Sequence, residues 1–175
     1  MNISKLDAAK RQLETAVELF FNHKDPVSIH TLTRAVHEIL EKLCRAQGLQ
    51  SVTEWGIIQI KKEKQEEIRN KMNEAKNFFK HAGKDSGVIL NFNTELSNFY
   101  LYDSVRLYQG LTKKLPKLFL IFNVWFFMKN PDLFSNDEQK NLFSLPKNLT
   151  LEDRDLENRE TFFQAALIAT AGIKE

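Results

Sequence analysis

Lys76, Asn77 and His81 are the residues of this chain whose types and spacing could do chemistry together. Asn77 and His81 are four residues apart, so on a helix they would share one face, with Lys76 beside them. A cation next to an imidazole can hold a phosphate, and histidine titrates near neutral pH, which suits acid–base chemistry. The sequence therefore predicts a small polar catalytic site on this helix. The alternative is structural, because a histidine near the C-terminal end of a helix is favoured by the helix dipole.

A second candidate site, for binding, consists of His30, Arg34 and His37 on one predicted helix. Helical spacing puts both histidines at the border of the apolar stripe and Arg34 further toward solvent. One of the histidines could then meet Asn77 and His81 across the bundle, as part of a shared polar cluster. The alternative is that each histidine is a core-edge residue bonded to a carbonyl or a carboxylate.

Neither a metal site nor a cofactor site is expected from the spacing of the histidines and glycines. A di-iron helical bundle needs Glu-x-x-His motifs, yet the residues three positions before the four histidines are Phe20, Val27, Arg34 and Phe78. The chain has no His-Glu-x-x-His motif and no glycine-rich loop between a strand and a helix that could cradle a nucleotide. We therefore predict no metal and no cofactor.

The candidate residues must be positioned by helices, because apolar residues recur at helical spacing and glycine and proline are scarce. A chain of 175 residues fits one domain. We predict an all-α fold, a single-domain bundle of about five to seven helices over 1–175. The expected helices cover about 4–22, 26–48, 60–82, 94–111, 116–130 and 155–171, with a short helix over 136–143.

Two stretches of the chain stand out within this helical pattern. Residues 116–129 are apolar around nearly the whole helical circumference, which predicts the most buried helix of the bundle. Residues 49–59 are ambiguous between a loop and a short turn in which Trp55 and Ile57 cover the core.

Composition limits the choice of partner and compartment only weakly. The net charge of +2 requires neither a nucleic acid nor a membrane as partner. Cys44 is the single cysteine, so no intramolecular disulfide can form, and we expect it in the core. The apolar run 118–128 is shorter than the roughly 20 residues of a membrane-spanning helix, so we expect no membrane span and a cytoplasmic location.

Asp103 and Arg106, three apart on one helix, are expected to form an ion pair.

Three segments of the chain, 5–40, 75–85 and 93–111, carry a resemblance to known proteins. Together they look like a group of uncharacterised bacterial proteins of similar size. More remotely, the helical pattern and the segment AKNFFKH resemble the HEPN superfamily (higher eukaryotes and prokaryotes nucleotide-binding). On this resemblance, residues of about 4–130 form a HEPN-like core and residues 131–175 a C-terminal helical extension.

Members of that superfamily are small helical bundles that often form dimers, and many are metal-independent endoribonucleases or toxins. Their motif is an arginine, usually a polar residue, and then a histidine, and Lys76, Asn77 and His81 fill those positions here. The resemblance implies attack of a ribose 2′-hydroxyl on the adjacent phosphate, with histidine as acid or base and the cation holding the phosphate. Lysine in place of arginine keeps the charge but lacks the planar fork that binds phosphate through two hydrogen bonds.

Two functions remain open at this point. The first is a helical interaction or regulatory module of HEPN-like type, associated with RNA or with a partner protein and without catalysis. The alternative is a metal-independent HEPN-like endoribonuclease, of toxin or defence type, that uses Lys76, Asn77 and His81. Fourteen phenylalanines, together with the resemblance, also predict a homodimer. The lysine substitution and the modest net charge favour the interaction module.

Overall fold

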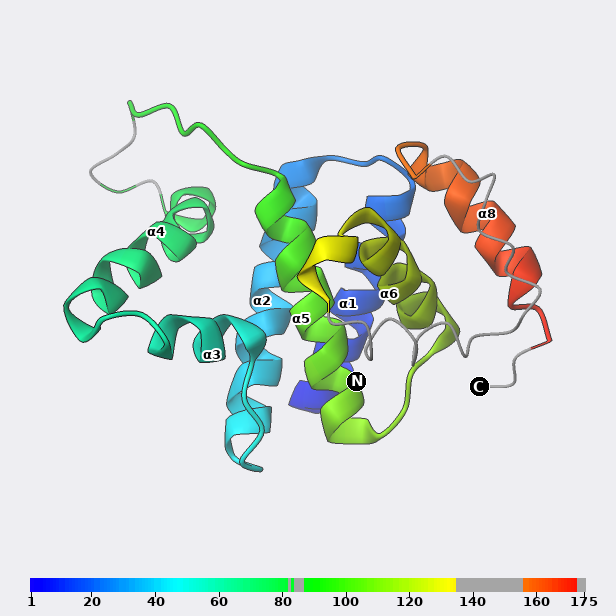
Figure 1. Cartoon of the computed structure of the whole chain (residues 1–175), viewed down its shortest axis with the longest axis horizontal. Helices are drawn as coiled ribbons and strands as arrows, with labels where there is room; N and C mark the ends of the chain where they lie inside the picture. The colour runs from blue at the N-terminus through cyan, green and yellow to red at the C-terminus, as the bar shows by residue number, and fades with distance from the viewer. Residues whose placement is uncertain (82, 84–86, 135–155, 173–175) are drawn as a thin grey trace.

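The computed structural model of this chain describes residues 1–81, 83, 87–134 and 156–172, and within them every regular element is helical. The all-α prediction is therefore confirmed for this part of the chain. Seven α-helices and one 3₁₀ turn are present there, and Figure 1 shows their arrangement: α1 Lys5–Phe21, α2 Pro26–Arg45, α3 Val52–Ile58, α4 Lys62–Lys80, α5 Glu95–Thr112, α6 Lys117–Lys129, η1 Pro131–Leu133 and α8 Arg159–Ala169.

The first two helices begin where their capping residues dictate. Ser4 accepts a hydrogen bond from the backbone N–H of Asp7 at 3.0 Å, and the Asp7 carboxylate accepts one from the backbone N–H of Ser4, which completes a capping box. Asp25 caps α2 in the same way through the N–H of Ser28, and Pro26 occupies the first turn, where a missing N–H has no cost. The short connection between α1 and α2 lets the two helices pack as antiparallel neighbours.

The core lies where α1, α2, α5 and α6 meet, and aromatic rings fill much of it. The eight consecutive residues Phe119 to Phe126 of α6 are all buried, as the sequence predicts for a helix that is apolar on every side. Phe122 packs edge-on against Phe20, with ring centroids 5.3 Å apart. Cys44 is also fully buried in this core, as expected.

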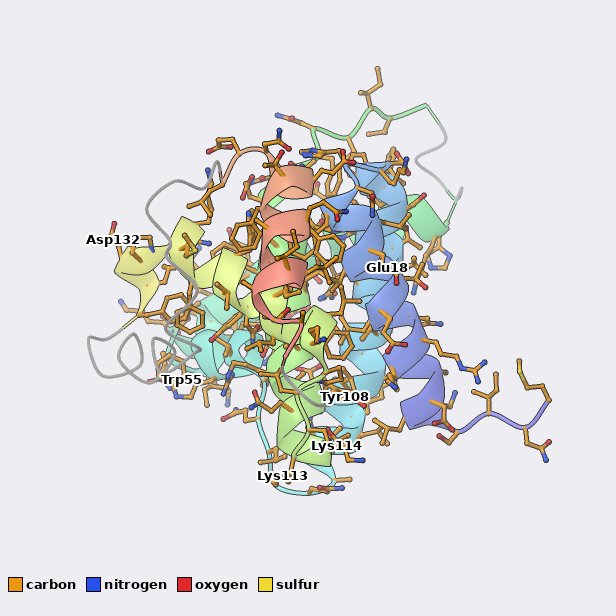
Figure 2. All side chains as sticks on the ribbon, turned by 90° about the vertical axis from the view of Figure 1, so that its right-hand side faces the viewer. Glu18, Trp55, Tyr108, Lys113, Lys114 and Asp132 are labelled. Carbon is orange, nitrogen blue, oxygen red and sulfur yellow. The ribbon has the colours of Figure 1, made fainter. Side chains whose placement is uncertain are left out.

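The helices α3 and α4 form an arm beside the bundle (Figure 1), and this arm builds the site described below. The ambiguous stretch 49–59 contains α3, in which Ile57 is buried whereas Trp55 is 57% exposed and lies at the periphery (Figure 2). Only Ile57 therefore covers the core. None of the residues of α4 is buried, because this helix contacts α2 and α3 along one side only.

At the opposite side of the bundle, α8 packs against α1 and α6 (Figure 1). Phe162 is buried there, and the ring of Phe163 stacks on Phe21 at 4.6 Å between centroids. The helix predicted over 136–143 falls outside the described residues. Among the residues that are described, no helix is both long and apolar enough to cross a membrane.

Candidate functional site

The three residues of the predicted catalytic motif have different surroundings in the structure. Lys76 turns toward α2 and forms an ion pair with Glu38. Asn77 is exposed. His81 is also exposed and follows the last residue of α4, and its backbone is extended (φ −133°, ψ 123°). The helix ends at Lys80, so the shared helical face that the spacing predicts does not extend to His81.

His30 lies deeper than the stripe border to which the sequence assigned it, because it is completely buried. Its Nδ1 lies 2.9 Å from the hydroxyl of Ser97, and its ring packs edge-on against Phe79 and Phe92. Its Nε2 has no hydrogen-bond partner among the described residues. Burial, and secondarily the charge of Arg34, lowers the pKa of His30 to about 4. We therefore place His30 in the core as a neutral imidazole rather than in a binding site.

The burial of His30 predicts that the protein loses stability in mild acid. Because the pKa in the folded chain is lower than the ordinary value of 6.5, this stability is complete above pH 6.5 and falls as the pH decreases toward 4. Over that window we expect a loss of up to about 3 kcal/mol in the free energy of unfolding. Urea denaturation at several pH values measures it, and His30→Leu, which cannot titrate, should flatten the profile. An unchanged slope in that variant would contradict the assignment.

His37 is buried as well, and its partner is Asp103 of α5. The imidazole Nε2 lies 3.0 Å from a carboxylate oxygen of Asp103, and both side chains are nearly inaccessible to solvent. The expected ion pair of Asp103 with Arg106 is present, with 3.8 Å between Oδ1 and Nη1, but Arg106 is exposed and its contact is longer than that of His37. The sequence predicted a carbonyl or a carboxylate as a possible partner of His37, and the structure shows that this partner is the carboxylate of Asp103.

Asp103 also holds the start of α3 against the bundle. Its carboxylate accepts hydrogen bonds from the backbone N–H groups of Val52 and Thr53, at 3.0 and 3.2 Å, and from the Thr53 hydroxyl at 3.1 Å. A carboxylate at the N-terminal end of a helix satisfies N–H groups that have no partner within the helix. Burial by itself would raise the pKa of Asp103, but the hydrogen bonds from His37, Val52 and Thr53 keep it below its usual value. Asp103 is therefore a structural anion that fixes α3.

Arg34 is the most unusual charged residue of the site. It is only 5% exposed, whereas the helical pattern put it toward solvent, and that placement is wrong because α4 and α5 both pack against α2. Its guanidinium lies 3.7 Å above the ring of Tyr100 and donates one hydrogen bond, from Nη2 to Asn73 Oδ1 at 2.7 Å. Its Nε has no partner, and no carboxylate of the described residues is within ion-pair distance of it.

Arg34 lines a cavity of about 310 Å³ between α2, α3, α4 and α5. Its walls carry two ion pairs, one between Lys76 and Glu38 and one between Arg69 and Glu54 with N–O distances of 2.5 and 2.8 Å. Two of the carboxylates that line the cavity are thus paired with cations of α4, and the third, Glu41, accepts a hydrogen bond from Ser51 at 2.6 Å. None of the three forms an ion pair with Arg34 among the described residues. An anion that entered the cavity would meet Arg34 at the bottom and Lys76 on the wall.

The chemistry available in this cavity is anion binding. A guanidinium can donate two parallel hydrogen bonds to phosphate or carboxylate, and a neighbouring ammonium adds charge. Within the described residues, no group of three or more histidine, cysteine or acidic side chains could hold a metal ion. The site therefore unites Arg34 and His37 of the predicted binding set with Lys76 of the predicted catalytic set, and leaves out His30, Asn77 and His81.

Glu38, Thr53 and Asn73 were not predicted as residues of the site, and Asp103 was predicted only as the partner of Arg106 and not of His37. Asp103 carried a usable signal, because it lies on the helical stripe with Tyr100 and Leu107 and a lone acid on an apolar stripe needs a buried partner. Glu38, Thr53 and Asn73 are common polar residues, and nothing in the sequence distinguishes their positions from solvent-exposed ones.

Comparison with protein-family models, with curated proteins and with solved structures gave no match to this chain.

Proposed function

We propose that this chain is a helical binding module of HEPN-like type that associates with RNA. It holds one RNA phosphate in the cavity between α2 and α4 and does not cleave the RNA. The observation that supports this most is Arg34, a nearly inaccessible guanidinium that has no carboxylate partner among the described residues and faces a cavity. Glu38 and Glu41 lie near enough to favour its charge, but its one hydrogen bond goes to the amide of Asn73, so an anion that binds in the cavity would supply the direct partner that this buried cation lacks.

The separation of His81 from the cavity supports binding over catalysis. General acid–base cleavage requires a proton-transfer group within hydrogen-bond reach of the phosphate-binding cation. Lys76 faces the cavity and Glu38, whereas Asn77 and His81 are exposed and are not among the residues that line it. His37 does line the cavity, but its Nε2 is engaged by Asp103. The cavity is thus equipped to hold an anion, and the histidine of the predicted catalytic motif does not lie at its cations.

Salt dependence of RNA binding tests this proposal. We expect a fluorescently labelled single-stranded RNA of about eight nucleotides to bind, with an affinity that falls as salt rises. Lys76→Ala should weaken binding and make the slope of log K against log salt shallower by about 0.7, since one phosphate contact is lost. Lys10→Ala is the matched control, because Lys10 is also paired with a carboxylate, that of Glu14, but lies on α1. Equal losses in the two variants, or no binding by the wild type, would refute the proposal.

The second candidate function is the endoribonuclease. It is favoured by one observation: the His81 side chain is exposed and forms no hydrogen bond to a described residue, so its imidazole is available to a substrate. Lys76 lies five residues earlier, on α4, where it could hold the scissile phosphate after release from Glu38.

His81→Ala separates the two functions. An exposed position at a helix end tolerates alanine, so we expect the free energy of unfolding to change by less than about 0.5 kcal/mol. If the chain is a nuclease, this variant should abolish cleavage of a labelled RNA in the presence of a chelator. If it is a binding module, the wild type and the variant should both leave the RNA intact and bind it equally. Cleavage that survives the substitution would exclude His81 as the acid or base.

A further inference from the structure

The depth of Arg34 bears on which phosphate of an RNA could reach it. Arg34, Tyr100 and His37 form the bottom of the cavity, at 5, 2 and 3% exposure. The ion pairs of the walls are more accessible. The side chains of Lys76 and Glu38 are 17 and 35% exposed, and those of Arg69 and Glu54 are 39 and 21% exposed. Arg34 is therefore less accessible than Lys76 and Arg69, the cations of the two ion pairs.

The guanidinium of Arg34 keeps a complete binding edge for such a ligand. Of its five N–H donors, only one on Nη2 is used, by Asn73. The two hydrogens of Nη2 belong to different edges of the guanidinium, one shared with Nε and one shared with Nη1. Because Nε is buried without access to solvent, the edge that a ligand in the cavity could reach is that of Nη1 and Nη2. Asn73 takes one hydrogen of Nη2, and when that hydrogen is the one beside Nε, the Nη1–Nη2 edge keeps two donors for two oxygens of a single phosphate.

An internal phosphodiester does not fit this arrangement well, because its chain continues on both sides. A cavity of about 310 Å³ lies at the lower limit of ligand pockets, so both nucleotides that flank an internal phosphate would have to leave it. A terminal phosphate has only one substituent and can reach the bottom with the remainder of the molecule outside. It also carries about −1.5 to −2 charges at pH 7, which is a better match for Arg34 and Lys76 together.

We infer that the cavity recognises a terminal phosphomonoester, at the end of an RNA or on a free nucleotide, through the fork of Arg34 at its bottom and the ammonium of Lys76 on its wall. This inference rests on the proposed association with RNA phosphate and specifies which phosphate is bound. The remaining nucleotides of an RNA would lie outside the cavity, past the ion pairs with Glu38 and Glu54.

Binding of three RNAs of one sequence tests the inference: one with a 5′-phosphate, one with a 3′-phosphate and one with hydroxyls at both ends. We expect at least one phosphorylated end to bind about tenfold or more tightly than the hydroxyl-ended RNA, as a charge-assisted pair of hydrogen bonds would give. Arg34→Lys keeps the charge but not the fork, and it should remove most of that preference. Lys10→Ala should preserve it, because Lys10 lies on α1 away from the cavity.

Adenosine monophosphate as competitor identifies the source of the phosphate. Displacement at the concentration at which the phosphorylated RNA itself binds supports a free nucleotide as ligand, and weaker displacement supports an RNA end. If all three RNAs bind the wild type equally and Arg34→Lys weakens them equally, the inference of a terminal phosphate is wrong while the proposed function stands. If none of the RNAs binds, both are wrong.

Discussion

Asp103→Ala is expected to reduce the free energy of unfolding by about 3–5 kcal/mol, the largest stability effect at this site. The substitution removes the buried partner of His37 and leaves the backbone N–H groups of Val52 and Thr53 without an acceptor. The loss of the buried partner of His37 contributes most, and the two partly buried N–H groups add less than the about 1–3 kcal/mol that a fully buried unsatisfied donor costs. Urea denaturation followed by circular dichroism measures the loss.

Two variants show whether the loss comes from these hydrogen bonds. Arg106→Ala removes only the exposed, 3.8 Å partner of the same carboxylate and should cost less than about 1 kcal/mol. Asp103→Asn retains one oxygen acceptor and can still bind some of the donors. Its loss of stability should therefore lie between those of Arg106→Ala and Asp103→Ala. A loss in Arg106→Ala as large as that in Asp103→Ala would show that Asp103 acts through the surface ion pair instead.

Arg34→Met should weaken RNA binding by about 2–5 kcal/mol, which corresponds to a loss of roughly 30-fold or more in affinity. Its fold should be preserved, because methionine fills similar space and removes a buried charge that has no carboxylate partner among the described residues. The lost contacts with Asn73 and Tyr100 oppose that gain, so we expect stability within about 1 kcal/mol of the wild type. Anisotropy titrations and urea denaturation of the same preparations measure the two quantities.

Two further substitutions distinguish a specific role of Arg34 from a general effect of charge. Arg11→Met removes an exposed arginine of α1 and should leave binding almost unchanged at moderate salt. Glu38→Gln removes the carboxylate that occupies Lys76 and should tighten binding a few-fold, since a partly exposed ion pair contributes about 0.2–1 kcal/mol. If all arginine substitutions weaken binding alike, the cavity is not the binding site.

Sequence reasoning succeeded where structure is determined by neighbours along the chain. The helix starts at Ser4 and Asp25 follow from hydrogen bonds to residues three positions away, and the burial of α6 follows from its uniformly apolar surface. These features need no knowledge of tertiary contacts. Helix type and order were therefore predictable along most of the described chain.

The site was only partly predictable, because its contacts join residues far apart in sequence. His37 and Asp103 are 66 residues apart, and Arg34 and Asn73 are 39 apart. A helical pattern assumes that one face of α2 is covered, but α4 and α5 cover it from two directions, and Arg34 becomes buried between them. The motif of Lys76 and His81 was recognised from spacing alone, and spacing cannot show that α4 ends at Lys80.

The most direct test of anion binding by Arg34 is the nuclear magnetic resonance signal of its Nε–H group in the ¹⁵N-labelled protein. Arg34→Met identifies that signal by its disappearance. A phosphate bound to the guanidinium should shift this resonance when the more tightly bound of the 5′- and 3′-phosphorylated RNAs is added. An Arg34 signal that stays unchanged while the RNA binds, or an RNA that does not bind at all, would contradict the account.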